Sequence, residues 1–192
     1  MLEGNTVRVD MDKLRQNVTE TALLLGRDDS AGHVRPRVTT RLIDNVHARS
    51  DFVQYDKEFS FECDESAGRA GRGDHPSPLR YFLSGLAFCQ QVWYAKGAAL
   101  VGCALEDLVI HVLTYMDMRG EHHLGDVPAN PQWIIIEAEV TSAANLATVL
   151  AMVDEANSRC PLYALVAKAI PIYERIALNG TVIRDTVPEG IS

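Results

Sequence analysis

The chain has 192 residues, 47% of them hydrophobic and 23% charged, which is typical of a globular protein with one domain-sized core. Its formal net charge of −8 argues against a nucleic-acid partner, because phosphate binding needs a clustered basic surface. No segment is apolar over a membrane-spanning length, so no membrane partner is expected either. The N-terminal residues scatter charges where a signal peptide would be apolar, and we therefore expect a cytoplasmic protein.

The first third of the chain predicts a helix followed by strands. Apolar residues recur at three- and four-residue spacing from Asp10 to Gly26, which favours a helix. Residues 27–35 are polar and form the expected linker, so residues 1–34 are interpreted as an N-terminal helical extension of a domain over residues 35–192. Two strands are expected, at Arg37–Ile43 and Phe59–Cys63. The glycines and prolines of Asp64–Pro78 predict a loop.

The remaining chain predicts a long helix and a second group of strands. Pro78 is well suited to the first position of a helix, which we expect to run from Ser77 to Lys96 and to end at Gly97. The further expected elements are strands at Leu105–Tyr115 and Trp133–Val140, a helix at Ala143–Asn157, a short helix opened by Cys160-Pro161, and one or two strands over Pro171–Arg184 around the hairpin signal Asn179-Gly180. This order of elements indicates the α+β class.

Cysteines stand at positions 63, 89, 103 and 160. In a reducing compartment they remain thiols unless they perform redox chemistry. None has the spacing of a zinc site, and the adjacent His122 and His123 lie in a polar turn where solvation is the usual state. We therefore predict neither a metal nor another cofactor. Cys63 and Cys103 match no motif and are interpreted as packing residues.

The other two cysteines differ in how strongly their context points to chemistry. Cys89 lies on the face of the long helix that also carries Phe82, Leu86 and Trp93, and a single helical cysteine in such a place is usually a small buried hydrophobe. Cys160 directly precedes Pro161 at a helix N-terminus. The positive end of the helix dipole stabilises a thiolate there, which raises the chance that Cys160 is reactive.

A family resemblance is carried by several motifs that occur in the expected order. The run SPLRYFLSGLAFC, from Ser77 to Cys89, resembles the OsmC/Ohr signature, in which a proline opens a long helix that carries a reactive cysteine. Cys160-Pro161 is similar to the second motif of the family, and Met118-Arg119-Gly120 resembles its turn between strands. The resemblance covers roughly Arg37 to Ile183.

The resemblance implies a fold, an assembly and a reaction. The fold would be the OsmC-like α+β fold, with mixed antiparallel sheets packed on a long central helix, in an intertwined homodimer. Cys89 would be the peroxidatic cysteine of a thiol-dependent hydroperoxide reductase, and Cys160 would resolve its sulfenic acid as a disulfide. The implied partners are an organic hydroperoxide and a thiol reductant, for which a dihydrolipoyl group is one candidate.

Two residues of the family site do not carry over simply. The family glutamate after the helix-opening proline is replaced by Leu79, which places the chain nearer the OsmC-like branch. Three acids are candidates to replace that carboxylate: Glu62, Glu65 and Asp74. The family arginine has three candidates before the loop, Arg37, Arg41 and Arg49, of which Arg49 is preferred for its distance from Cys89 in the sequence, although a solvated surface charge is an equally good interpretation.

Two other functions stay open at this stage. The same fold without the glutamate could hold an apolar ligand in a cavity at the dimer interface, with Cys89 an inert core thiol. A redox-sensing protein would form the disulfide with peroxide but turn over poorly. Rapid alkylation of Cys89 at neutral pH favours the enzyme over the binding protein.

Overall fold

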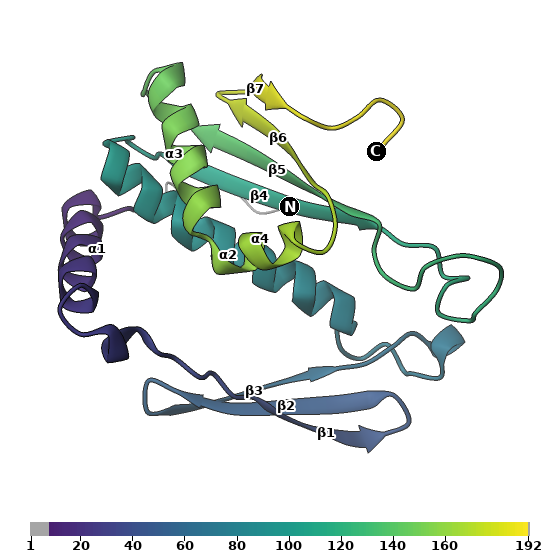
Figure 1. Cartoon of the computed structure of the whole chain (residues 1–192). Coiled ribbons are helices and arrows are strands. Elements are labelled where there is room, and N and C mark those ends of the chain that lie inside the picture. The colour runs from purple at the N-terminus through teal and green to yellow at the C-terminus, as the bar shows by residue number, and fades with distance from the viewer. Residues whose placement is uncertain (1–7, 192) are drawn as a thin grey trace. The chain divides into compact units, whose positions relative to one another are not determined.

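The structure is a computed structural model that describes residues 8–191. Its elements in chain order are helix α1 (Met11–Leu25), strands β1 (Thr39–Asp44), β2 (His47–Gln54) and β3 (Lys57–Cys63), helix α2 (Pro78–Val101), strands β4 (Asp107–Tyr115) and β5 (Trp133–Thr141), helices α3 (Leu146–Arg159) and α4 (Pro161–Ala167), and strands β6 (Ile172–Leu178) and β7 (Thr181–Asp185) (Figure 1). Short 3₁₀ turns cover Asp29–Gly32 and Ala67–Arg69. The predicted α+β class is confirmed.

The chain divides into two compact units. The N-terminal unit consists of Leu23–Ser84, and the C-terminal unit combines the residues up to Ala22 with Gly85–Ser192. Each unit contains one of the two sheets. In the described part of the chain, no helix combines the length and the apolar character that a membrane span requires.

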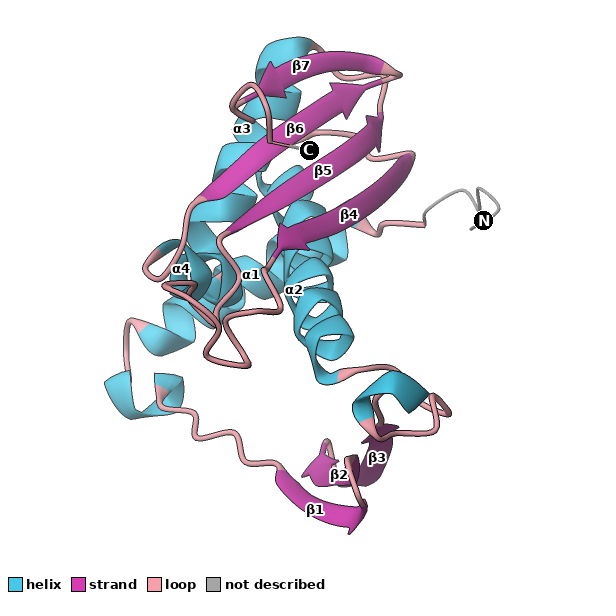
Figure 2. Cartoon of the chain, turned by 90° about the vertical axis from the view of Figure 1, so that its right-hand side faces the viewer, coloured by secondary structure: helices cyan, strands magenta, loops and turns pink. Residues whose placement is uncertain are grey.

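The C-terminal unit is built on a four-stranded sheet in the order β4-β5-β6-β7. The central pair β5 and β6 is parallel, whereas the two outer pairings are antiparallel. Helices α2 and α3 cover one face of this sheet (Figure 2). The predicted central strand is confirmed in β5, where the β-branched run Ile134, Ile135 and Ile136 is almost completely buried.

The end of α2 differs from the sequence prediction. We expected Gly97 to end the helix, but α2 continues to Val101, and Gly102, with a φ of 74°, follows it. Gly97 instead lies where α2 meets α3, since a Cβ atom there would be 3.0 Å from the carbonyl oxygen of Met152. The missing side chain lets two helix backbones approach closely, and this use of glycine outweighs its low helix propensity.

The N-terminal unit contains the antiparallel sheet β1-β2-β3. Strands β1 and β3 lie close to their predicted positions, but β2 was missed. Its sequence is HARSDFVQ, which places polar residues on both faces of the strand. It therefore lacks the alternation of apolar and polar residues that marks a half-buried strand. The turn from β2 to β3 is tight, because Tyr55 and Asp56 both have positive φ angles, of 55° and 56°.

Helix α1 confirms the helix that the sequence predicted in the N-terminal extension. None of its residues is buried. It is attached within the C-terminal unit by Arg15, whose Nε donates a hydrogen bond of 2.8 Å to the carbonyl oxygen of Ala99. Val9 and Met11 also pack against the hydrophobic core of this unit. The boundary between extension and domain, placed at residue 34, stays a prediction.

Candidate functional site

The two cysteines singled out in the sequence meet in the C-terminal unit. Cys89 comes from α2 and Cys160 from the junction between α3 and α4, and their Sγ atoms are 3.0 Å apart. Both are free thiols. The sequence separates them by 71 residues, so their contact depends on the packing of α2 against the segment that joins α3 to α4. The distance permits disulfide formation after a small approach, since a disulfide bond is about 2.05 Å long.

Cys160 is buried at the N-terminus of α4. Its Sγ accepts a hydrogen bond from the backbone N–H of Tyr163, as the N-cap residue of a helix does. Burial and the hydrogen bond with Cys89 nevertheless raise the pKa of Cys160 to about 11, and the Tyr163 N–H lowers it only in part. The helix dipole that the sequence analysis invoked is therefore opposed by burial, which has the larger effect on the Cys160 pKa, and the reactivity of Cys160 stays a prediction.

Cys89 is only partly buried. The face of α2 that is buried in the C-terminal unit carries Leu86, Gln90 and Tyr94. Cys89 precedes Gln90 and so lies at the edge of that face. Its interpretation as a fully buried packing residue does not fit this position, since part of its surface is accessible to a small molecule.

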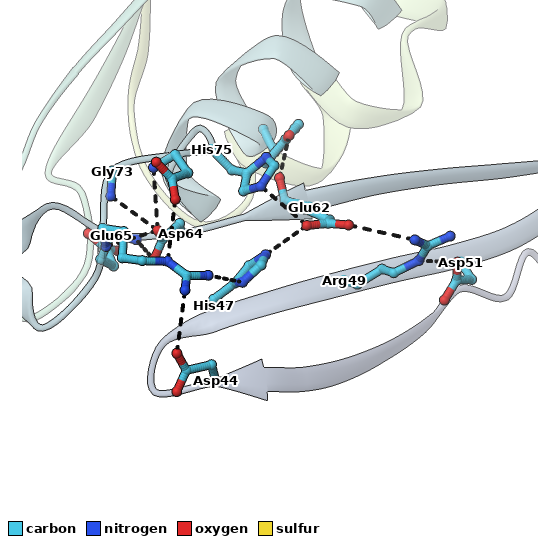
Figure 3. A network of polar contacts seen from close by, with 12 residues as sticks. Asp44, His47, Arg49, Asp51, Glu62, Asp64, Glu65, Gly73 and His75 are labelled. Atoms are coloured by element: carbon cyan, nitrogen blue, oxygen red, sulfur yellow. Dashed lines mark hydrogen bonds and ion pairs between the residues drawn. The ribbon is translucent and has the colours of Figure 1, made fainter.

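Arg49, the third predicted site residue, lies on β2 in the N-terminal unit. Its Nε donates a 2.8 Å hydrogen bond to Asp51, and its Nη1 lies 3.6 Å from Oε1 of Glu62 on β3. Figure 3 shows the guanidinium between these two carboxylates. Arg49 and Glu62 are direct neighbours in the β2–β3 register, so their side chains leave the same face of the sheet. The hydrogen bond with Asp51 raises the pKa of Arg49.

That polar face also lines an open pocket of about 1150 Å³ within the N-terminal unit. Four arginines line it, Arg35, Arg37, Arg41 and Arg49. All three arginines that the sequence offered therefore border one pocket. Among these three, Arg49 is the one whose side chain contacts both Asp51 and Glu62. Arg49 belongs to a different unit from the two cysteines, and its catalytic role stays a prediction.

The two other cysteines and the histidine pair, which the sequence analysis discounted, are packed or exposed. Cys103 is completely buried, 3.7 Å from the hydroxyl of Ser142, as expected of a packing residue. Cys63 is partly buried at the end of β3. His122 and His123 are exposed in the turn between β4 and β5. Two histidines that the sequence analysis did not single out, His47 and His75, lie with Glu62 in the N-terminal unit.

Comparison with protein families identifies the family of the chain. The model of the OsmC-like protein family matches residues 71–175, which is more than half of the chain. The chain therefore belongs to the OsmC-like family, and the resemblance seen in the sequence is confirmed. A search of curated proteins gave no match.

Solved structures share the fold at low sequence identity. An OsmC-like protein from Mycoplasma pneumoniae is 16% identical, with a TM-score of 0.63 over 76% of this chain and 97% of its own. An organic hydroperoxide resistance protein OsmC from Legionella pneumophila is 14% identical, with a TM-score of 0.56 over 76% and 99%. An organic hydroperoxide resistance protein from Elizabethkingia anophelis is 10% identical, with a TM-score of 0.57 over 76% and 99%.

The environment of Cys160 predicts how its alkylation depends on pH. In a Cys89→Ser variant, burial still keeps the Cys160 pKa above the ordinary value, so the rate of labelling by iodoacetamide should rise by about tenfold per pH unit up to about pH 10. When the same variant is unfolded in guanidinium chloride, its labelling rate should level off nearer pH 9, because an ordinary thiol has a pKa of about 8.5. The labelling rate is measured by mass spectrometry of the peptide that contains Cys160. If the rate in the folded protein reached a plateau below pH 8, this would contradict the raised pKa.

Proposed function

We propose that the protein is a thiol-dependent reductase of organic hydroperoxides, in which Cys89 is the peroxidatic residue and Cys160 the resolving residue. The observation that carries this proposal is the 3.0 Å separation of the two Sγ atoms. A thiol at this distance can attack the sulfur of its neighbour once that sulfur is oxidised, and the fold brings the two together from distant parts of the sequence. The names of the Legionella and Elizabethkingia neighbours point to the same substrate class.

The proposed cycle balances in three steps. The Cys89 thiolate attacks the distal oxygen of the hydroperoxide ROOH, the O–O bond breaks, and the alkoxide takes a proton and leaves as the alcohol ROH. Cys89 is then a sulfenic acid. The Cys160 thiol attacks its sulfur, forms the Cys89–Cys160 disulfide and releases water. An external dithiol, for which a dihydrolipoyl group is our candidate, then reduces the Cys89–Cys160 disulfide to two thiols and is itself oxidised to a disulfide.

The environments of the two cysteines support this division of roles. Cys89 is partly exposed, so a hydroperoxide can reach it, whereas Cys160 is completely buried. The pKa of Cys160, raised to about 11 by burial, keeps it a protonated thiol at neutral pH. A buried neutral thiol is a poor first nucleophile, but it is already in contact with the sulfur that it has to attack once Cys89 is oxidised.

We assign the family arginine to Arg49 and the replacement for the missing glutamate to Glu62. Leu79 occupies the position of that glutamate and cannot bind a guanidinium. Glu62 can, and together with Asp51 it holds Arg49 from two sides. Glu65 forms an ion pair with Arg69 instead, and Asp74 with Arg72. In this proposal, Arg49 stabilises the Cys89 thiolate and the oxyanion that leaves, which requires it to approach Cys89 in the assembled protein.

We also propose that the protein is a homodimer. In β1, β2 and β3 no apolar side chain is buried. The face opposite Arg49 carries Phe52, Phe59 and Phe61, with Phe59 and Phe61 each more than 40% exposed. A three-stranded sheet needs an apolar face packed against another layer to be stable. A second copy of the chain supplies that layer. The four free thiols also fit a cytoplasmic location.

Mass spectrometry tests the two-cysteine mechanism directly. One equivalent of cumene hydroperoxide should remove two hydrogens from the reduced protein, leave a sulfenic acid in a Cys160→Ser variant, and leave Cys89→Ser unchanged. If the parent protein keeps its mass, it is not a hydroperoxide reductase, and an OsmC-like binding protein becomes the better proposal. Formation of the disulfide without turnover by any dithiol would favour a redox sensor.

A pair of arginine variants separates a role in the site from a general effect of charge. Arg49→Met keeps the apolar stem but removes the guanidinium, so the rate constant for oxidation of Cys89 should fall by about 10²-fold, as for loss of one stabilising donor. Arg41→Met is the matched control, because Arg41 lies on the same face, 3.8 Å from the same Asp51. Stopped-flow measurements that give equal rate constants for the two variants would remove Arg49 from the site.

Sedimentation equilibrium tests the dimer. The chain has a mass of 21.2 kDa, so the parent protein should sediment at twice this mass at micromolar concentration. Phe59→Asp places a charge on the aromatic face and should weaken dimerisation at least about tenfold. Tyr55→Asp is the control, because Tyr55 is 81% exposed in the β2–β3 turn. A parent protein that is monomeric, or an equal effect of both variants, would exclude this interface.

A further inference from the structure

Two histidines and a carboxylate converge in the N-terminal unit, on the polar face that also carries Arg49. Oε2 of Glu62 lies 2.7 Å from Nε2 of His47 and 3.2 Å from Nε2 of His75. The two imidazole rings are stacked, with centroids 5.1 Å apart and planes inclined by 16°. Figure 3 shows both rings directed at the same carboxylate. One ligand atom from each residue lies within 4.8 Å of the other two.

The three residues come from separate segments that are each held in place. His47 begins β2, and Glu62 lies near the end of the neighbouring strand β3. His75 lies in the loop between β3 and α2, and that loop is organised by the buried carboxylate of Asp64. Its oxygens accept hydrogen bonds from the backbone N–H groups of Glu65, Arg72, Gly73 and Asp74.

The loop has little freedom to change shape. A Cβ atom at Gly71 would lie 1.9 Å from the carbonyl oxygen of Glu65, so only glycine fits there. The four backbone N–H groups that donate to the Asp64 carboxylate close the loop around this side chain. His75 is therefore presented to Glu62 by a rigid support.

We propose that His47, Glu62 and His75 form a binding site for a divalent transition-metal ion, Zn²⁺ in the first place. Two imidazole nitrogens and one carboxylate oxygen are the donor set of zinc sites with an open coordination position. Ligand atoms about 2.1 Å from a tetrahedral ion lie about 3.4 Å apart. The 3.2 Å contact is already close to this spacing, and the 2.7 Å contact has to open by about 0.7 Å.

The site retains access to solvent. The side chains of His47, Glu62 and His75 are 11%, 27% and 36% exposed, so an ion can enter and keep a water molecule as its fourth ligand. Glu62 needs only Oε2 for the ion, and Oε1 remains directed at Arg49. The site is therefore compatible with the proposed role of Arg49 but does not depend on the peroxidase proposal.

Arg72 is the group that competes with the ion. Its Nη2 lies 3.1 Å from Nδ1 of His47, which makes Nδ1 the acceptor and leaves Nε2 protonated and bonded to Glu62. Metal binding requires the other tautomer, with the proton on Nδ1 and the lone pair of Nε2 free. Arg72 must therefore turn away when the ion enters. Its side chain is 58% exposed and pairs with Asp44 and Asp74 at the surface, so this movement is open to it.

The test is a titration of the full-length, reduced, metal-free protein with Co²⁺, followed by the visible absorption of the ion, with Zn²⁺ then added to displace it. We expect one equivalent to bind with the spectrum of a nitrogen- and oxygen-ligated site. His75→Ala should weaken binding at least tenfold, and Arg72→Met should tighten it severalfold, because the competing donor is gone. The tighter binding of Arg72→Met cannot result from damage to the fold.

Two controls distinguish this site from other donors in the chain. His122→Ala/His123→Ala removes the exposed histidine pair and should leave the affinity unchanged. Cys89→Ser/Cys160→Ser removes the close thiol pair and should leave the spectrum unchanged, with no cobalt–thiolate charge-transfer band in the parent protein. Binding that survives His75→Ala, or that is lost in either control, would overturn the proposal. Because the readout is metal binding alone, its failure leaves the hydroperoxide reductase proposal intact.

Discussion

The close approach of α2 to α3 at Gly97 is the constraint on which the cysteine pair depends. A Cβ atom at Gly97 would touch the carbonyl oxygen of Met152 at 3.0 Å, so two rigid helices meet backbone to backbone at this point. Cys89 lies about two turns before Gly97 on α2, and Cys160 directly follows the last residue of α3. The spacing of the helices therefore sets the spacing of the sulfur atoms. A larger residue at position 97 would separate the helices and with them the thiols.

The sequence predicted those elements whose local signals agree with their place in the fold. Pro78 at a helix start, Cys160-Pro161 and the Asn179-Gly180 hairpin are local signals, and the structure has each of them. Gly97 was misread because a glycine that ends a helix and one that admits a neighbouring helix look the same in one sequence. Strand β2 was missed because both of its faces carry polar residues, and its pairing is decided by β1 and β3.

The candidate site was predictable in its identity but not in its chemistry. The spacing of motifs identified Cys89 and Cys160, and the structure brings them into contact. Whether a helix dipole or burial controls a thiol depends on tertiary packing, however, and here burial controls Cys160. The same holds for the histidines. His47 and His75 have no metal-ligand spacing, and they meet because a strand and a loop fixed by Asp64 present them to Glu62.

The carboxylate of Glu62 takes part in both proposals, because it contacts Arg49 and would also bind the metal ion. In the metal-free state its charge is shared between Arg49 on one oxygen and two histidines on the other. An ion at Oε2 would place a dication between this carboxylate and the two histidines and withdraw electron density from Oε1. Arg49 would then rely more on Asp51, whose 2.8 Å contact with Nε is the shorter of its two. With Leu79 in place of the family glutamate, Arg49 is held by two carboxylates of its own sheet, Asp51 and Glu62. An ion bound by the histidines and Glu62 would therefore change the strength of the contact between Glu62 and Arg49.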